Sequence, residues 1–318
     1  MKKIRLDQWL AIGLICVGLL TSQLTPLTAA PGTTFQPLTL VAPAPLPVLR
    51  SDAPELASLL TAESVMVIDV PSGSVLFEKN AEQLRYPAST TKMMTALIAS
   101  ESYQMDHILT VGEEALIEGT VMGLQLNEQI PVRDVLHGLL LTSGNDAAFL
   151  LANHYPQGGY QGFMYRMNQR AQQLHLDNTH FINPSGLDAE GQTSSARDLL
   201  LLAKELMKNP LLREIVGTRQ YTASDLSGEI QHQLVSSNHF LGIEPGVIGV
   251  KTGTTPLAGE ILISEVQQQQ RDVLIAVLGS SDRYGDTQQI LRWLWQSYEW
   301  QELTHPTQSS QLPDSTHQ

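Results

Sequence analysis

The order of apolar patterns along the chain is the feature that most constrains its fold. Strand-like patterns occupy 64–70 and 75–78 and do not return until residue 247. Between them, apolar side chains recur at helical spacing, for example over 132–140 and 199–206. Strands at both ends with helices in the middle do not fit a strict βαβ alternation. The pattern predicts an α/β (α+β) domain in which an antiparallel sheet of N- and C-terminal segments packs against a mostly helical middle region.

We predict that the C-terminal part of the chain supplies the remaining strands of this sheet. Apolar runs at 247–252, 260–266 and 273–279 indicate three strands, and a helix is expected over 286–302. The domain is therefore expected to span 58–302, and we find no internal repeat. The polar residues 303–318 predict a disordered tail.

Composition excludes several classes of protein. Of the 318 residues, 42% are hydrophobic and 16% are charged, which is typical of a globular chain. The formal net charge of −13 argues against a nucleic-acid partner, because phosphate backbones require a basic surface. Cys16 is the single cysteine, so no disulfide can form within the chain. The nine histidines lack metal-ligand spacing, so neither a metal nor a cofactor is predicted.

The N-terminus has the order of an export signal. Basic residues within 2–5 precede an apolar run over 9–20, and small residues follow at 28–30. We predict that 1–30 is a secretory signal, and the alternative of an uncleaved membrane anchor stays open. Either form places the rest of the chain in the periplasm or on the outer face of the cytoplasmic membrane. The proline-rich residues 31–57 are expected to be an extended linker.

The first of three short motifs is Ser89-x-x-Lys92, at the start of a predicted helix. Residues three apart lie on one face of a helical turn, so both side chains point the same way. Helix N-terminal N–H groups stabilise negative charge on an attacked carbonyl, and a lysine can accept the serine proton if it is partly neutral. Burial and a second cation would both lower its pKa. Alone, the pattern also fits an N-cap serine and a surface lysine.

The second motif is Ser143-Gly-Asn145, between two apolar helices. The Ser143 hydroxyl could relay a proton toward a leaving amine, and the Asn145 amide could hold a lysine and a substrate amide together. In isolation, a turn between helices with Asn145 or Asp146 as the N-cap is the favoured explanation. A second Ser-x-Asn at 236–238 is interpreted as structural.

The third motif is Lys251-Thr252-Gly253-Thr254, at the end of an apolar strand. Lys251 supplies a cation for a substrate carboxylate and helps to keep Lys92 neutral. The Thr252 hydroxyl can bind the same carboxylate, and Gly253 leaves room for a substrate backbone along the strand. The backbone N–H of Thr254 is predicted to join that of Ser89 in an oxyanion hole. The alternative is an exposed strand end with a gatekeeper lysine.

Ser-x-x-Lys, Ser-x-Asn and Lys-Thr-Gly in this order form the motif set of penicillin-binding proteins and class A β-lactamases. The chain resembles the D-alanyl-D-alanine carboxypeptidases, the low-molecular-weight penicillin-binding proteins of the S11 serine peptidase family. The resemblance runs from about Ala62 to Gly279. Beyond the motifs, it is carried by the segments 123–126, 139–148, 163–168, 178–188 and 195–199.

The resemblance implies a β-lactamase/transpeptidase-like fold and an acyl-enzyme mechanism. Ser89 would be the nucleophile and Lys92 its general base, with Ser143 and Asn145 completing the proton network. Lys251 and Thr252 would bind the terminal carboxylate, next to Gly253 and Thr254. The substrate implied is the peptidoglycan stem pentapeptide, with β-lactam antibiotics as covalent inhibitors.

Two positions depart from the family, and three alternatives stay open. Ser185 and Thr254 stand where members often have histidine. The short chain after Gly279 resembles members that are endopeptidases cutting peptide cross-links. A β-lactamase needs a carboxylate that activates water, and Asp188 and Glu190 are the nearest acids to offer one. A non-catalytic penicillin-recognising protein is disfavoured because all three motifs are intact.

Overall fold

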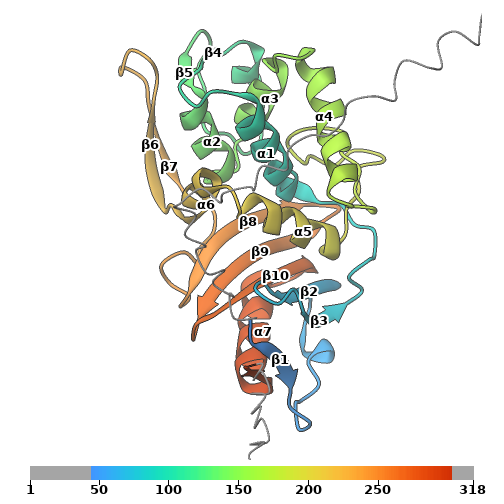
Figure 1. Ribbon diagram of the computed structural model, residues 1–318. Coiled ribbons are helices and arrows are strands. Elements are labelled where there is room, and N and C mark those ends of the chain that lie inside the picture. Colours follow the sequence, from blue (N-terminus) through green and yellow to red (C-terminus); the bar gives the residue numbers. More distant parts are fainter. Residues whose placement is uncertain (1–43, 303–318) are drawn as a thin grey trace, which may run out of the picture. The chain divides into compact units, whose positions relative to one another are not determined.

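The computed structural model describes residues 44–302. Its centre is a five-stranded antiparallel sheet with the order β3-β2-β10-β9-β8, so the first hairpin lies beside the last strands of the chain (Figure 1). The predicted joining of N- and C-terminal segments in one antiparallel sheet is confirmed. The strands are β2 (Ser64–Asp69), β3 (Val75–Lys79), β8 (Val247–Thr255), β9 (Gly259–Gln268) and β10 (Arg271–Ser280).

Helices cover both faces of this sheet. Six of them come from the middle of the chain and form the helical region on one side, whereas α7 packs against β9 and β10 on the other side (Figure 1). Their bounds are α1 (Lys92–Ser102), α2 (Val132–Leu140), α3 (Asn145–Asn153), α4 (Gly159–Gln173), α5 (Ala196–Leu206), α6 (Pro210–Gly217) and α7 (Arg283–Ser297).

Alternation along the central strands creates two separate cores. On β2, Val65 and Val67 pack with α7, while Met66 and Ile68 pack with the helical region. Successive side chains of a strand point to opposite faces, so a strand covered on both sides needs apolar residues at every position. This requirement explains the continuous apolar runs of the sequence.

Two further strands lie where none was predicted. β1 (Leu46–Leu49) pairs with β11 (Tyr298–Gln301) in a separate antiparallel ribbon. Ordered structure therefore begins within the segment that we expected to be a linker, and the last helix ends at Ser297 before β11. The prolines of this segment led us to predict a linker and not a strand. Proline is nevertheless tolerated in a two-stranded ribbon, because it lacks only the N–H donor.

Two small hairpins flank the helical region, and sequence patterns did not predict them. One joins β4 (Ile108–Thr110) to β5 (Gln129–Pro131), and the other joins β6 (Gln220–Ser224) to β7 (Gln231–Val235). The exposed surface of β6 and β7 carries mainly polar side chains, so their strand pattern is weak.

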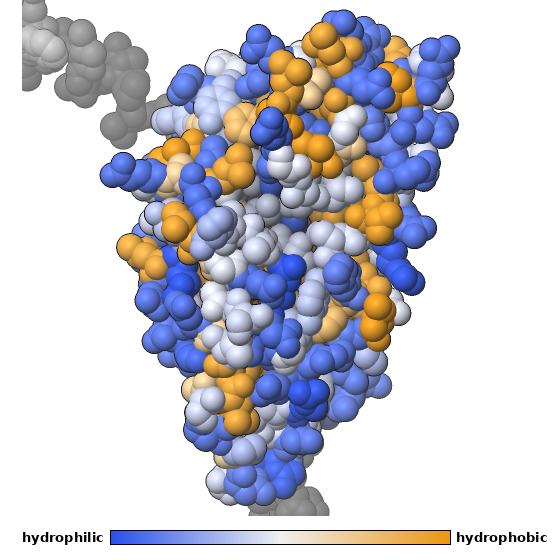
Figure 2. Space-filling model, turned by 180° about the vertical axis from the view of Figure 1, so that it is seen from behind, coloured by the Kyte–Doolittle hydropathy of each residue, from blue (hydrophilic) through white to orange (hydrophobic). Residues whose placement is uncertain are grey.

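The predicted signal at 1–30 and the tail at 303–318 lie outside the described residues. Among residues 44–302, no helix combines the length and apolarity that crossing a bilayer requires. On the face seen from behind, apolar side chains form separate groups among polar ones (Figure 2).

Candidate active site

Ser89 lies in a 3-10 turn, Ala88–Thr91, that leads directly into α1. The Lys92 side chain is fully buried, and its Nζ lies 3.0 Å from the Ser89 Oγ. Ser89 itself is only partly buried, so its hydroxyl can meet a molecule arriving from solvent. A half-exposed hydroxyl next to a buried amine is the arrangement that a serine nucleophile requires.

Two other acceptors fix the Lys92 amine. Its Nζ donates to the Asn145 Oδ1 at 2.9 Å and to the Ser185 carbonyl oxygen at 2.6 Å. A neutral amine has two N–H donors and one lone pair. With both donors engaged by Asn145 and Ser185, the lone pair points toward the Ser89 hydroxyl and can accept its proton.

The second and third motifs meet through Lys251. The Lys251 Nζ donates to the Ser143 Oγ at 3.0 Å and to the Thr252 carbonyl oxygen at 2.9 Å. Ser143 is 6% exposed and has a φ of 65°, a left-handed conformation that non-glycine residues rarely adopt. Three stretches that are distant in sequence therefore converge on one cluster, as the motifs predicted.

Burial and like charge act together on the two amines. Burial, and secondarily the Lys251 ammonium, lower the pKa of Lys92 well below its usual value, although Asp146 acts in the opposite direction. Burial, and secondarily Arg283, lower the pKa of Lys251 to about 7. The lowered pKa of Lys92 favours its neutral form, which can accept a proton, near neutral pH.

Gly253 brings the edge strand against the nucleophile's turn. β8 lies at the edge of the sheet, and a Cβ added at Gly253 would lie 3.2 Å from the Ser89 backbone nitrogen. We predicted this glycine to make room for a substrate backbone. The structure shows a more direct reason for a glycine at this position: without a side chain, β8 can approach the turn that carries Ser89.

Thr252 and Thr254 have different surroundings on β8. Thr252 is 5% exposed, and its Oγ1 lies 2.8 Å from the Ser237 Oγ. Thr254 is exposed, and its Oγ1 accepts a hydrogen bond from the Arg283 Nη1 at 2.8 Å. The Ser-x-Asn that we interpreted as structural thus places Ser237 within the cluster, and Arg283 at the start of α7 is a second residue that the sequence did not reveal.

Asp146 anchors the loop that leads to the cluster. Its carboxylate, 2% exposed, accepts N–H groups from Met122, Gly123 and Leu124 at 2.9–3.1 Å. Asp146 follows Asn145 directly, and Asn145 accepts a hydrogen bond from Lys92. The Asp146 bonds therefore hold Asn145 in place against the loop before β5. In the sequence, Asp146 offers only a possible N-cap, so this anchoring role was not predicted.

The acids considered for a β-lactamase have other surroundings. The Asp188 carboxylate accepts hydrogen bonds from the Thr255 Oγ1 at 2.7 Å and from the Leu257 N–H at 3.3 Å. Glu190 is exposed. Asp188 therefore ties its loop to the β8–β9 turn, which is a structural role for the residue.

Comparison with known proteins agrees with this geometry. A family model described as D-alanyl-D-alanine carboxypeptidase, the S11 peptidases, matches residues 51–282. The chain belongs to the S11 peptidase family. A D-alanyl-D-alanine carboxypeptidase of Bacillus subtilis is 33% identical to this S11 chain over 254 residues, covering 77% of the chain and 64% of the relative.

Other relatives show how far the match extends. An Escherichia coli D-alanyl-D-alanine endopeptidase is 30% identical and is covered over 78% of its length, with 76% of this S11 chain aligned. The Streptomyces K15 DD-transpeptidase structure matches with a TM-score of 0.70 at 29% identity, covering 74% of this chain and 98% of its own. The S11 chain spans slightly less than two thirds of the length of several carboxypeptidase relatives. The predicted transpeptidase-like fold is confirmed.

Proposed function

We propose that this protein is a serine-type D-Ala-D-Ala carboxypeptidase that removes the terminal D-alanine of peptidoglycan stem pentapeptides. The observation that carries the proposal is the buried Lys92 amine, held by Asn145 and Ser185 with its third position at the Ser89 hydroxyl. The S11 relatives named as carboxypeptidases support the same activity.

In the proposed reaction, the Ser89 Oγ attacks the carbonyl carbon of the penultimate D-alanine while Lys92 accepts its proton. The backbone N–H groups of Ser89 and Thr254 stabilise the oxyanion. The protonated Lys92 passes its proton to Ser143, held by Lys251, as Ser143 donates its own proton to the leaving D-alanine nitrogen. Water then attacks the acyl-Ser89 ester while Lys92 takes one of its protons, and Lys92 returns this proton to the Ser89 oxygen as the shortened peptide leaves.

Substrate selection in this proposal depends on the terminal carboxylate. Lys251 supplies the positive charge, and the Thr252 hydroxyl, oriented by Ser237, donates a hydrogen bond. β-Lactams carry a carboxylate and a reactive amide at a similar separation, so the proposal includes covalent inhibition at the same serine. No metal or cofactor takes part in it.

Covalent labelling tests the nucleophile. After incubation with benzylpenicillin, mass spectrometry of the purified protein is expected to show one adduct, located on the peptide that contains Ser89. Ser89→Ala should abolish the adduct, and Ser72→Ala, a control at a turn serine after β2, should retain it. An adduct on another residue, or none, would contradict the proposal.

The pH profile tests the two lysines. The value of kcat/KM is expected to fall at acid pH as Lys92 becomes protonated and can no longer accept the serine proton. It should also fall as pH rises through about 7, the pKa of Lys251 in the free enzyme, because the carboxylate then loses its cation. A flat kcat/KM profile between about pH 6 and pH 9 would exclude these roles.

Two assays separate the carboxypeptidase from the endopeptidase. The proposal expects D-alanine release from pentapeptide to exceed cleavage of cross-linked muropeptide dimers. The reverse order would assign the endopeptidase activity for which one relative is named. Rapid turnover of a chromogenic cephalosporin would instead assign a β-lactamase.

The proposal also places the protein outside the cytoplasm. An N-terminus with basic residues, then an apolar run, then small residues supports export to the periplasm or to the outer face of the cytoplasmic membrane. Fractionation of cells, with N-terminal sequencing of the recovered protein, would distinguish a cleaved signal from a retained anchor. Recovery in the cytoplasmic fraction would overturn this placement.

A further inference from the structure

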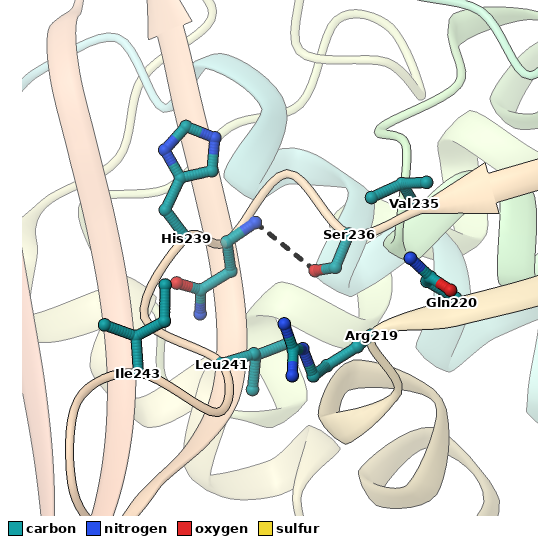
Figure 3. Close-up of a pocket in the computed structure, with 8 residues that line it drawn as sticks. Arg219, Gln220, Val235, Ser236, His239, Leu241 and Ile243 are labelled. Atoms are coloured by element: carbon teal, nitrogen blue, oxygen red, sulfur yellow. Dashed lines mark hydrogen bonds between the residues drawn. The ribbon is translucent and has the colours of Figure 1, made fainter.

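A cavity of about 200 Å³ lies at the base of the β6–β7 hairpin, apart from the Ser89 cluster (Figure 3). Arg219 precedes β6, Val235 ends β7, and the loop toward β8 supplies Asn238, Leu241 and Ile243. The lining contains no aspartate or glutamate, although the chain has a net charge of −13. The cavity therefore combines an aliphatic wall with polar side chains, one of which is a cation and none of which is an anion.

The Asn238 side chain provides a donor that has no acceptor. The residue is 5% exposed, and its Oδ1 accepts the Phe240 N–H at 3.1 Å. This bond fixes the amide orientation, because exchanging the two atoms would place an NH₂ group against an N–H. The Nδ2 is buried and has no hydrogen-bond partner within residues 44–302. A buried donor without an acceptor is unfavourable, and an acceptor atom brought to the Nδ2 would remove this cost.

Arg219 adds a positive charge to the same cavity. Its side chain is exposed and makes no ion pair with any described residue. It packs across Gly242, where an added Cβ would lie 2.9 Å from the Arg219 Nη1. A planar guanidinium matches the two oxygens of a carboxylate, and the Nδ2 of Asn238 can donate to one of them.

We propose that this cavity binds the carboxylate of a peptide whose neighbouring side chain is aliphatic. Arg219 and Asn238 would hold the carboxylate, and Val235, Leu241 and Ile243 would contact the apolar group. The site is separate from the Ser89 cluster, and its existence does not depend on the proposed hydrolysis.

Ser237 connects the loop that lines the cavity to Thr252, the β8 residue proposed to bind the substrate carboxylate. Ser237 lies between Ser236 and Asn238, and its hydroxyl contacts the Thr252 hydroxyl. The Tyr284 hydroxyl accepts the His239 N–H at 3.1 Å and donates to the Ser237 carbonyl at 3.2 Å, so α7 holds the same loop. A bound carboxylate at Asn238 would therefore stabilise the loop that orients Thr252.

The test uses the full chain labelled with ¹⁵N and N-acetyl-L-leucine as the probe. Titration is expected to move the side-chain amide resonance of Asn238, and N-acetyl-L-leucinamide should not move it. Arg219→Gln should weaken binding by about tenfold, the loss expected for one charged hydrogen bond. Arg292→Gln, which changes an exposed arginine on α7, should leave binding unchanged.

Three results would overturn the site: equal binding of acid and amide, equal binding by Arg219→Gln and the unchanged chain, or an Asn238 resonance that does not respond. The last result would mean that water alone occupies the cavity. None of them affects benzylpenicillin labelling of Ser89. Failure of that labelling would leave the titration intact, so the two proposals can fail separately.

Discussion

Lys92→Ala is expected to lower the rate of acylation by benzylpenicillin by about 10²- to 10⁴-fold, the usual contribution of a general base. The variant loses the buried amine that lies 3.0 Å from the Ser89 Oγ, so the hydroxyl proton has no acceptor. The measurement is the second-order rate constant for adduct formation, followed by mass spectrometry. Thermal unfolding of the same sample establishes that the variant is folded.

Lys208→Ala is the matched control for this variant. Lys208 is exposed and pairs with Glu205 on the surface, so its removal should leave acylation unchanged. An acylation rate of Lys92→Ala within about threefold of the unchanged protein would exclude Lys92 as the base. If Lys208→Ala is acylated as slowly as Lys92→Ala, the slow reaction would not be specific to Lys92 and would not support its role as the base.

Gly186→Ala is expected to destabilise the fold by about 3 kcal/mol or more and to reduce acylation strongly. Gly186 has a φ of 86°, and an added Cβ would lie 1.8 Å from the Ala88 carbonyl oxygen, next to Ser89. Backbone must therefore move on one side of the contact. Either movement separates the Ser185 carbonyl from Lys92 or shifts the Ser89 turn. Urea unfolding and the acylation rate together measure the effect.

Gly191→Ala is a control that distinguishes the effect of backbone strain at a positive φ from the effect of the steric clash at Gly186. Gly191 has nearly the same φ, 83°, but the nearest atom to an added Cβ is the Ile182 Cδ1 at 3.7 Å. This variant should lose about 1–3 kcal/mol from backbone strain alone and retain normal acylation. Equal stability and equal acylation of the two variants would show that the Gly186–Ala88 contact has no role in the site.

Sequence alone identified the groups whose chemistry depends on side-chain type. Ser89, Lys92, Ser143 and Lys251 could be predicted as candidates because few residue types can act as nucleophile, base or cation, and because their short spacings are visible in the sequence. The structure places them in one cluster. The Ser185 carbonyl was not found, since any residue supplies one. Ser237 and Arg283 were not predicted because their positions relative to Thr252 and Thr254 arise only when β8 packs beside the preceding loop and the start of α7.

The fold was predictable to a similar degree. Continuous apolar runs identified the strands of the central sheet, because both faces are covered. β1 and β11 were missed because a two-stranded ribbon at the surface buries little and needs no regular apolar pattern. The backbone pairing of Pro47 with Trp300 depends on the two chain segments meeting, which local sequence does not encode.

The placement of β2 between β3 and β10 has a consequence for biosynthesis. During translation Ser89 and Lys92 are made before Lys251 and before β10, the strand that fills the sheet position next to β2. Until then Lys92 has neither its low-dielectric surroundings nor the repulsion from Lys251, and it stays protonated like any lysine in water. A nascent chain that has not yet reached β8 and β10 is therefore expected to lack a neutral amine beside Ser89 and so to be unreactive toward penicillin.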